Sequence, residues 1–166
     1  SGAIAVALSR AMPATPGHAV DLSPDALALA MTNLEALAPN GKWHLHQGRW
    51  WEPLEPWWGH IDLVVCNPPY IPSDLIHNLD PVVRDHEPHL ALAGGIDGLQ
   101  AIREVVAEAC RALAPGGWIL IEHHHDQSAP VLNLLKQAGL SSIRAARDLE
   151  GVNRFALARR SLSPCS

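Results

Sequence analysis

The order of apolar segments is the feature that most constrains the fold of this 166-residue chain. Short apolar runs typical of strands alternate with segments whose apolar residues recur every three or four positions, as on one face of a helix. We predict helices at residues 3–11, 99–113 and 130–138, and a further helix that opens at residues 23–25 and is ended by residues 39–41. We predict strands at 18–22, 43–47, 61–66, 118–122, 142–146 and 154–158. Strands that alternate with helices indicate an α/β domain with a mainly parallel sheet.

Local signals mark two of these boundaries. Ser23 is suited to cap the helix that follows it, Pro24 suits its first turn, and Asp25 favours the positive end of its dipole. Residues 71–98 form a long, polar connection that contains prolines. Connections of this length in compact domains are usually functional or disordered.

Size and composition favour one globular domain at residues 1–160, followed by a flexible tail at 161–166. The chain is 48% hydrophobic and 17% charged, which is enough apolar material for a core. Its net charge of -5 lacks the basic excess of nucleic-acid-binding proteins, and no apolar run is long enough to span a membrane. The three cysteines are odd in number and lack a CxxC spacing, so we expect no disulfide framework, no metal site and a cytoplasmic location.

Polar residues follow three of the predicted strands: Asp21, the segment Asn67-Pro68-Pro69-Tyr70, and Glu122 with His123. Ligands of open α/β sheets bind beyond the carboxyl ends of the strands, so we expect these residues to gather at one edge. An acidic residue at the position of Asp21 commonly binds ribose hydroxyls, although a surface carboxylate that assists a helix cap is an equal alternative. Glu122 is equally consistent with a catalytic carboxylate and with one that binds a helix start or water.

The segment Asn67-Pro68-Pro69-Tyr70 carries the most chemical information. Its prolines remove two backbone donors and stiffen the turn, which leaves carbonyl oxygens without internal partners. The side-chain oxygen of Asn67 beside such a carbonyl makes a pair of acceptors for an NH2 group, and Tyr70 supplies a flat face to cover it. A rigid turn after a buried strand would explain the prolines but not Asn67 and Tyr70.

This segment resembles the signature loop of S-adenosylmethionine-dependent methyltransferases that act on exocyclic or amide nitrogen. Residues 86–92 and 94–99 resemble the corresponding segment of HemK/PrmC-type enzymes, which methylate the glutamine of the Gly-Gly-Gln motif in peptide chain release factors. Residues 1–5 resemble the second half of the family's glycine-rich cofactor loop. The resemblance covers nearly the whole chain and implies a Rossmann-like class I methyltransferase fold whose first strand is missing from this chain.

The resemblance also implies roles for single residues. Gly2 would lie near the methionine part of S-adenosyl-L-methionine, Asp21 would bind the ribose hydroxyls, and Trp50 would lie near the adenine, with Asn67 also at the cofactor. Arg49 departs from the acidic or small polar residue that these enzymes often carry beside the adenine site.

On the substrate side, Asn67 and Pro68 would accept the two amide hydrogens of the glutamine of a release factor, with Pro69 in the same loop and Tyr70 packed beside the amide. The predicted catalytic residues are therefore Asn67, Pro68 and Tyr70. The expected partner is a release factor, with neither a membrane nor nucleic acid as a main partner.

Other interpretations remain open for the chain and for its unusual clusters. An adenine-N6-like methyltransferase of nucleic acid and a truncated domain that binds without catalysis are the alternatives, and a dinucleotide oxidoreductase ranks low. Adjacent strand residues point to opposite faces, so residues 123–125, three consecutive histidines, favour a strand-end loop over a metal site. The five tryptophans between residues 43 and 58 favour packing around a surface loop, apart from Trp50.

Overall fold

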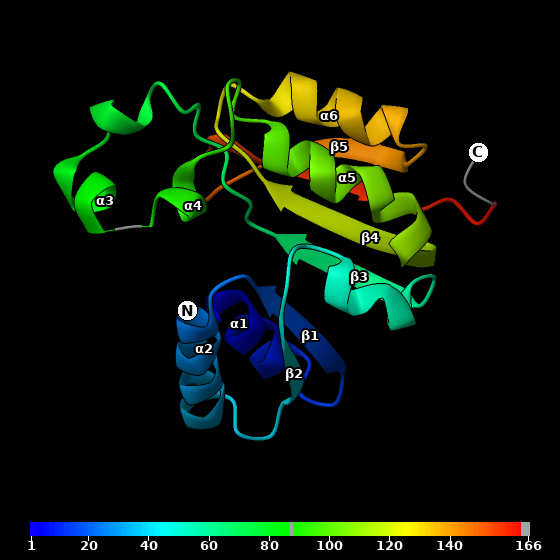
Figure 1. Ribbon diagram of the computed structural model, residues 1–166. Coiled ribbons are helices and arrows are strands. Elements are labelled where there is room, and N and C mark those ends of the chain that lie inside the picture. Colours follow the sequence, from blue (N-terminus) through cyan, green and yellow to red (C-terminus); the bar gives the residue numbers. More distant parts are fainter. Residues whose placement is uncertain (87, 164–166) are drawn as a thin grey trace. The chain divides into compact units, whose positions relative to one another are not determined.

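A computed structural model describes residues 1–86 and 88–163 of the chain (Figure 1). The chain divides into two compact units, Ser1–Pro56 and Trp57–Ser166, which we call the N-terminal unit and the C-terminal unit. Glu87, which falls within one of the segments that carry the family resemblance, lies outside the described residues. Residues 164–166, half of the predicted tail, also lie outside them.

The N-terminal unit contains two helices and two parallel strands. Its elements are α1 (Ala3–Ala11), β1 (Pro16–Asp21), α2 (Pro24–Leu37) and β2 (Lys42–Gln47), and η1 (Glu52–Trp57) follows them. The two strands pair in register from Pro16 opposite Lys42 to Asp21 opposite Gln47. Both helices pack on one face of this pair, where Ala19, Trp43 and Leu45 contact a small core. That core consists of Ala5, Val6, Leu34 and Ala38.

The predicted start of α2 is confirmed in atomic detail. The backbone N–H of Ala26 donates to Ser23 Oγ at 3.2 Å, and Pro24 occupies the first turn, where its missing N–H costs nothing. At the start of α1, Gly2 has a φ of 71°, and a Cβ built on it would lie 2.7 Å from the Ala30 Cβ. A glycine is therefore needed where α1 approaches α2.

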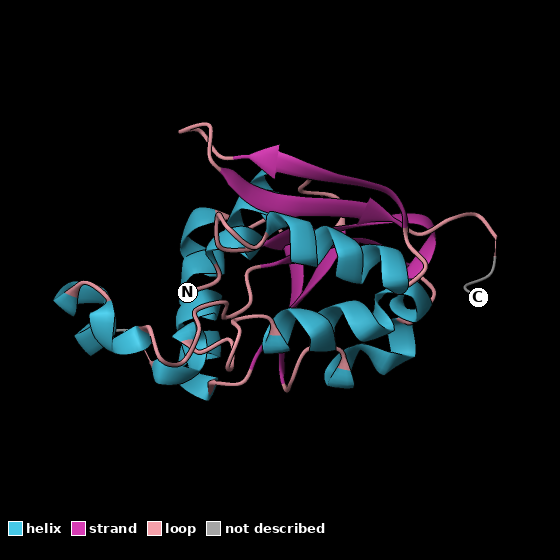
Figure 2. Cartoon of the chain, turned by 90° about the horizontal axis from the view of Figure 1, so that it is seen from above, coloured by secondary structure: helices cyan, strands magenta, loops and turns pink. Residues whose placement is uncertain are grey.

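The C-terminal unit is a four-stranded sheet in the order β3-β4-β6-β5. Its elements are β3 (Ile61–Cys66), η2 (Ile76–Asn78), α3 (Pro81–His86), α4 (His89–Leu92), α5 (Gln100–Ala112), β4 (Leu113–Glu122), α6 (Ser128–Gln137), β5 (Ser141–Arg147) and β6 (Asn153–Arg159). Strands β3 and β4 are parallel, whereas β6 runs antiparallel to both of its neighbours. Figure 2 shows β5 and β6 as a hairpin.

The core of the C-terminal unit lies between this sheet and two helices. Helix α5 packs on β4, and α6 packs on β5 and β6. The side chains of β4 alternate between buried and partly exposed, as expected of a strand with one face on the core. Among the described residues, the hydrophobic ones with no exposed surface are Ile102, Ala109, Ala112, Leu113, Ile119, Ile121, Val131, Leu135, Ala156 and Ala158.

The predicted α/β class is confirmed, and three details differ from the sequence prediction. The sheet is mixed, because a short turn at Asp148–Val152 joins β5 to β6 and forces them to be antiparallel. Strand β4 begins at Leu113 and not at residue 118, with an irregular register between Ile61 and Leu63 of its neighbour. The connection at 71–98 contains the short helices η2, α3 and α4, each too short to give a periodic signal.

Two findings concern the cysteines and the membrane. Cys110 is disulfide-bonded, so the expectation of no disulfide is wrong at this residue, and Cys165 lies outside the described residues. Across residues 1–86 and 88–163, no helix is both long and apolar enough to cross a membrane.

Candidate active site

The Asn-Pro-Pro-Tyr loop, residues 67–70, begins where β3 ends in the C-terminal unit. Because Cys66 at the end of β3 pairs with Ile121 of β4, the loop starts beside the end of β4, where Glu122 lies. Pro68 is fully buried, whereas Asn67 is exposed. The loop is thus anchored by a proline in the interior and presents its asparagine at the surface.

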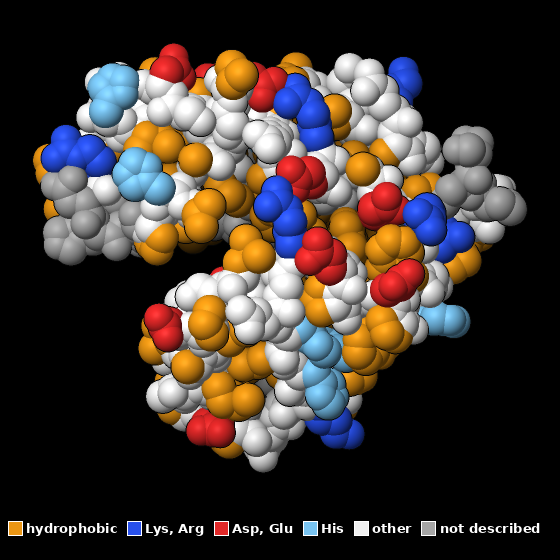
Figure 3. All heavy atoms as spheres, viewed as in Figure 1, with side chains coloured by type: hydrophobic (Ala, Val, Ile, Leu, Met, Phe, Trp, Pro, Cys, Tyr) orange, Lys and Arg blue, Asp and Glu red, His pale blue; other side chains and the backbone are white. Residues whose placement is uncertain are grey.

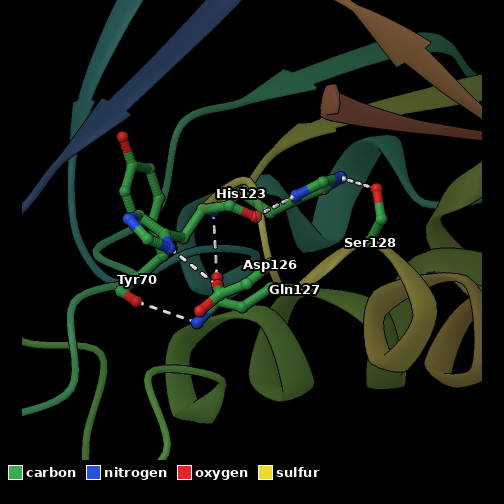
Figure 4. Close-up of polar contacts among 6 residues, drawn as sticks. Tyr70, His123, Asp126, Gln127 and Ser128 are labelled. Carbon is green, nitrogen blue, oxygen red and sulfur yellow. Dashed lines mark hydrogen bonds and ion pairs between the residues drawn. The ribbon is translucent and has the colours of Figure 1, made fainter. Parts of the chain in front are cut away.

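Tyr70 is held at both ends. Its hydroxyl donates to Glu122 Oε1 at 3.2 Å. Its backbone carbonyl accepts from Gln127 Nε2 at 3.0 Å, as Figure 4 shows. Gln127 is buried, and its side-chain oxygen accepts the backbone N–H of His124 at 3.0 Å. The side chain of Gln127 therefore ties the loop to the turn that follows β4.

The second segment of the family resemblance packs against this loop. The Ile71 N–H donates to the Leu92 carbonyl at 3.0 Å, and the Gly94 N–H donates to the Ile71 carbonyl at 2.8 Å. Gly98 has a φ of 72°, and a Cβ built on it would lie 2.3 Å from the Tyr70 carbonyl oxygen. A side chain at position 98 would therefore occupy the space where Gln127 meets Tyr70.

The three consecutive histidines form part of this turn. His123 is fully buried, with Nδ1 at 2.7 Å from the His124 carbonyl oxygen and Nε2 at 3.3 Å from Ser128 Oγ (Figure 4). His124 Nδ1 lies 2.6 Å from Asp126 Oδ1, and the bond lowers the pKa of that carboxyl group. Within the described part of the chain, no group of three or more His, Cys, Asp or Glu is arranged to hold a metal ion.

Burial and charge shift the pKa of groups near the loop. Burial, followed by the charge of Glu122 and its hydrogen bond, raises the pKa of Tyr70 above its ordinary value. Burial raises the pKa of the Cys66 thiol to about 12. The Arg103 side chain donates to the Asp97 carboxylate, and this hydrogen bond lowers the pKa of Asp97 to about 2.

Three of the four cofactor residues expected from the resemblance, Gly2, Asp21 and Trp50, lie in the N-terminal unit, whereas Asn67 lies in the C-terminal unit. Asp21 ends β1, and its Oδ1 accepts the Ser23 N–H at 2.9 Å, so the helix-cap alternative for this residue is present in the structure. The Gly48 N–H donates to the Asp21 carbonyl at 3.1 Å, which brings the segment after β2 close to the end of β1. Trp50 follows in this segment with a φ of 47°, an unusual value for a residue with a side chain.

Sequence reasoning missed two features. It left open whether Glu122 is a catalytic carboxylate or one that binds a helix start or water, whereas in the structure Glu122 accepts the Tyr70 hydroxyl. It gave no role to Gln127, which donates to the Tyr70 carbonyl. The histidines of the N-terminal unit looked scattered, yet the parallel register places His18 opposite His44, and His18 Nδ1 lies 2.9 Å from His46 Nε2. The alternation of His44 and His46 along one strand was the signal that could have shown this cluster.

The charge on the surface is mixed. On the face drawn in Figure 3, lysine and arginine side chains are scattered among acidic and apolar ones. The net charge of the chain is -5.

Comparison with known proteins identifies relatives. A release factor glutamine methyltransferase from Prochlorococcus marinus is 56% identical over 160 residues, which cover 96% of this chain and 55% of that protein. A solved structure of a ribosomal protein L11 methylase from Lactobacillus delbrueckii subsp. bulgaricus matches with a TM-score of 0.62 at 15% identity, over 96% of this chain and 65% of that one. The S-adenosylmethionine-dependent methyltransferase SibL, in its apo form, matches with a TM-score of 0.61 at 15% identity, over 96% of this chain and 48% of that one. No protein-family model matches the chain.

These comparisons bear on fold and on ancestry separately. The two solved structures confirm the Rossmann-like class I methyltransferase fold expected from the sequence. The 56% identity shows that the sequence of this chain is similar to that of a release factor glutamine methyltransferase. The chain spans about half the length of that relative.

Proposed function

We propose that this chain transfers a methyl group from S-adenosyl-L-methionine to a glutamine side-chain amide nitrogen. Its 56% identity over 160 residues to a release factor glutamine methyltransferase supports the proposal. The proposed glutamine is that of the Gly-Gly-Gln motif in peptide chain release factors. The partner is therefore a protein of the translation machinery, and the proposed location is the cytoplasm. The observation that carries the proposal is the Asn-Pro-Pro-Tyr loop, which exposes Asn67 while Tyr70 is hydrogen-bonded at both ends.

In this proposal the loop grips the substrate carboxamide. Asn67 Oδ1 and the Pro68 carbonyl accept the two amide hydrogens, Pro69 stiffens the turn, and the Tyr70 ring packs beside the amide. Burial of Pro68 supports this assignment, because a carbonyl attached to an anchored proline keeps its direction while a ligand binds.

The residues of the N-terminal unit that we propose to bind the methyl donor are Gly2, Asp21 and Trp50. The carboxylate of Asp21 uses Oδ1 for the Ser23 N–H, and since a carboxylate has two oxygens it retains acceptor capacity for ribose hydroxyls. Gly2 is the N-cap of α1, and the backbone N–H groups at the start of a helix suit the carboxylate of the methionine part. Trp50 supplies an aromatic face for the adenine. These residues fit the donor, which supplies a sulfonium-bound methyl group when it is bound.

The chain's own contribution to the reaction is orientation. An amide nitrogen is a poor nucleophile because its lone pair is delocalised into the carbonyl. Two acceptors on its hydrogens orient the NH2 group for in-line attack and stabilise the positive charge that develops on the nitrogen. Transfer would form the N–CH3 bond as the S–CH3 bond breaks, with the bonding electron pair left on sulfur and one of the two amide protons released to water.

We further propose that residues 1–160 form the single catalytic domain predicted from the sequence. In support, each of the two solved methyltransferases matches 96% of this chain.

Replacement of Asn67 tests the proposal most simply. The variant Asn67→Ala is expected to lose methyl transfer to a release factor by two orders of magnitude or more, roughly the effect of removing one donor or acceptor at a reacting centre. Its affinity for S-adenosyl-L-methionine, measured by calorimetry, should fall far less than its turnover.

The exposed Asn133→Ala on α6 is the matched control, since it removes the same side chain away from the loop. It should keep wild-type turnover. Equal turnover in Asn67→Ala and the wild-type chain would contradict the proposal.

A further inference from the structure

We propose that Glu122 is a positioning residue of the proposed site, which fixes the Tyr70 ring against which the substrate carboxamide packs. The inference rests on the proposed function for the identity of the substrate, and on the hydrogen bonds of the C-terminal unit for everything else. Glu122 acts through Tyr70 and does not need to touch the substrate.

The backbone of Glu122 is held by its strand. It is the last residue of β4, which lies between β3 and β6 in the sheet, and it pairs with Phe155 of β6. The residue before it, Ile121, pairs with Cys66 at the end of β3 and has no exposed surface. A side chain on such a strand starts from a fixed point, which makes it a precise support for a neighbouring loop.

Tyr70 needs this second support. Gln127 holds its backbone carbonyl, and Ile71 continues the backbone through its own hydrogen bonds to Leu92 and Gly94. These contacts fix the backbone but leave the ring free to rotate about its side-chain torsions. The bond from the hydroxyl to Glu122 Oε1 holds the far end of the ring and so selects one orientation.

The charged groups around the Tyr70 hydroxyl keep it protonated, so that it can donate a hydrogen bond. Glu122 from β4 raises the pKa of Tyr70, burial raises it further, and Arg154 from β6 lowers it. Arg154 is itself bonded to Asp148, with Nε at 3.2 Å from Oδ2. The ring of His124 lies 6.3 Å from that of Tyr70 and is paired with Asp126. A phenol in this setting donates to Glu122 at neutral pH and does not act as a base.

Tyr70 is the only tyrosine in the chain, so its ionisation can be followed directly. In a near-ultraviolet absorbance titration, the tyrosinate signal reports Tyr70 alone. We expect the pKa of Tyr70 to fall in Glu122→Gln, because that variant keeps the size of the side chain and removes its charge. Glu108→Gln is the matched control, because Glu108 pairs with Arg111 on the surface and should leave the titration unchanged.

Kinetics then separate positioning from general stability. If the wild-type chain is active, the KM for a release factor should rise in the order wild type, Glu122→Gln, Glu122→Ala, with a roughly 2- to 10-fold increase for loss of the hydrogen bond. The affinity for S-adenosyl-L-methionine should not change. Tyr70→Phe should reproduce the effect of Glu122→Ala, and the double variant should be no worse than either single one.

The outcomes distinguish this inference from the proposed function. An unchanged Tyr70 titration in a folded Glu122→Gln, or additive effects of Tyr70→Phe and Glu122→Ala, would overturn the role of Glu122. If Glu122→Gln fails to fold, the KM of Tyr70→Phe for a release factor is the test. A KM equal to that of the wild-type chain would also overturn the role of Glu122. A wild-type chain that transfers no methyl group, but whose titration responds to Glu122, would contradict the proposed function while leaving the contact intact.

Discussion

The two units differ in how completely they bury their cores. In the C-terminal unit, side chains from α5, α6, β4 and β6 have no exposed surface, whereas the buried hydrophobic residues of the N-terminal core keep 3% to 9% of theirs. The C-terminal unit has four strands and the N-terminal unit has two. Two strands with helices on one face are close to the smallest arrangement that is stable in water.

This difference tells us where each part of the proposed site gets its rigidity. The Asn-Pro-Pro-Tyr loop is attached to the better-packed unit, through Pro68, Glu122 and Gln127. Asp21 belongs to the smaller unit, and its side chain accepts a local hydrogen bond from the Ser23 N–H, two residues along the chain. We therefore expect the Asn-Pro-Pro-Tyr loop to be preorganised. We expect the residues proposed to bind the methyl donor to be perturbed more easily.

The largest effect is expected at Cys66, whose raised pKa reflects the burial of the C-terminal unit. A pKa of about 12 against an ordinary 9.0 leaves about a thousandfold less thiolate near neutral pH. Alkylation by iodoacetamide at pH 8, followed by peptide mass mapping at Cys66, should therefore be slower than for an unfolded control by a factor of that order. Alkylation of the folded chain at the unfolded rate would show that this unit is not packed as described.

A matched pair of leucines compares the two cores directly. Leu135→Ala in α6 removes a side chain with no exposed surface, and Leu34→Ala in α2 removes one that is 7% exposed. Both should lower the free energy of unfolding within the range of about 2–5 kcal/mol, with the larger loss at Leu135. Denaturant titration with hydrogen exchange resolved by unit checks this, and a larger loss for Leu34→Ala would reverse the comparison.

Gly98→Ala tests the rigidity of the loop within the C-terminal unit. The added Cβ meets the Tyr70 carbonyl and the Gln127 side chain at a positive φ, so we expect a loss of about 1–3 kcal/mol in unfolding free energy and weaker methyl transfer. Gly151→Ala is the control, because its φ of 82° imposes the same backbone strain while nothing lies within 4 Å. Equal losses in both variants would mean that the contact with Tyr70 contributes nothing.

The smallest effect is expected from the histidines of the N-terminal unit. Burial, then His46 and His44, lower the pKa of His18 below its ordinary 6.5. The unfolded chain then binds more protons than the folded one just below pH 6.5, so stability is retained above that pH and lost as the pH falls through it. His18→Gln should flatten this dependence, as measured by hydrogen exchange in α1 and α2 between pH 7 and 5. An unchanged slope would contradict the assignment.

Local signals allowed much of the fold to be predicted from sequence. Ser23 with Pro24 placed the start of α2, and the apolar run at 61–66 predicted β3 to the residue. The antiparallel placement of β6 between β4 and β5 could not be predicted in the same way, because it depends on long-range pairing. The local hint was the turn at Asp148, whose carboxylate accepts the N–H groups of Glu150 and Val152.

The residues of the candidate site also fall into those that local sequence identified and those that depend on long-range contacts. Asn67 and Tyr70 were identified because a polar pair around two prolines has few structural explanations. Glu122 and Gln127 were not assigned to Tyr70, since their contacts join residues more than fifty positions apart. The glycines at 94–98 were recognised only as part of a resemblance, and the contact of Gly98 with the Tyr70 carbonyl gives that pattern a physical reason.

Mass spectrometry of a release factor, incubated with the wild-type chain and S-adenosyl-L-methionine, tests the central claim most directly. The account predicts one added methyl group, located by fragmentation on the glutamine of the Gly-Gly-Gln motif. A methyl group on any other residue, or none when the chain is shown by calorimetry to bind the donor, would contradict it.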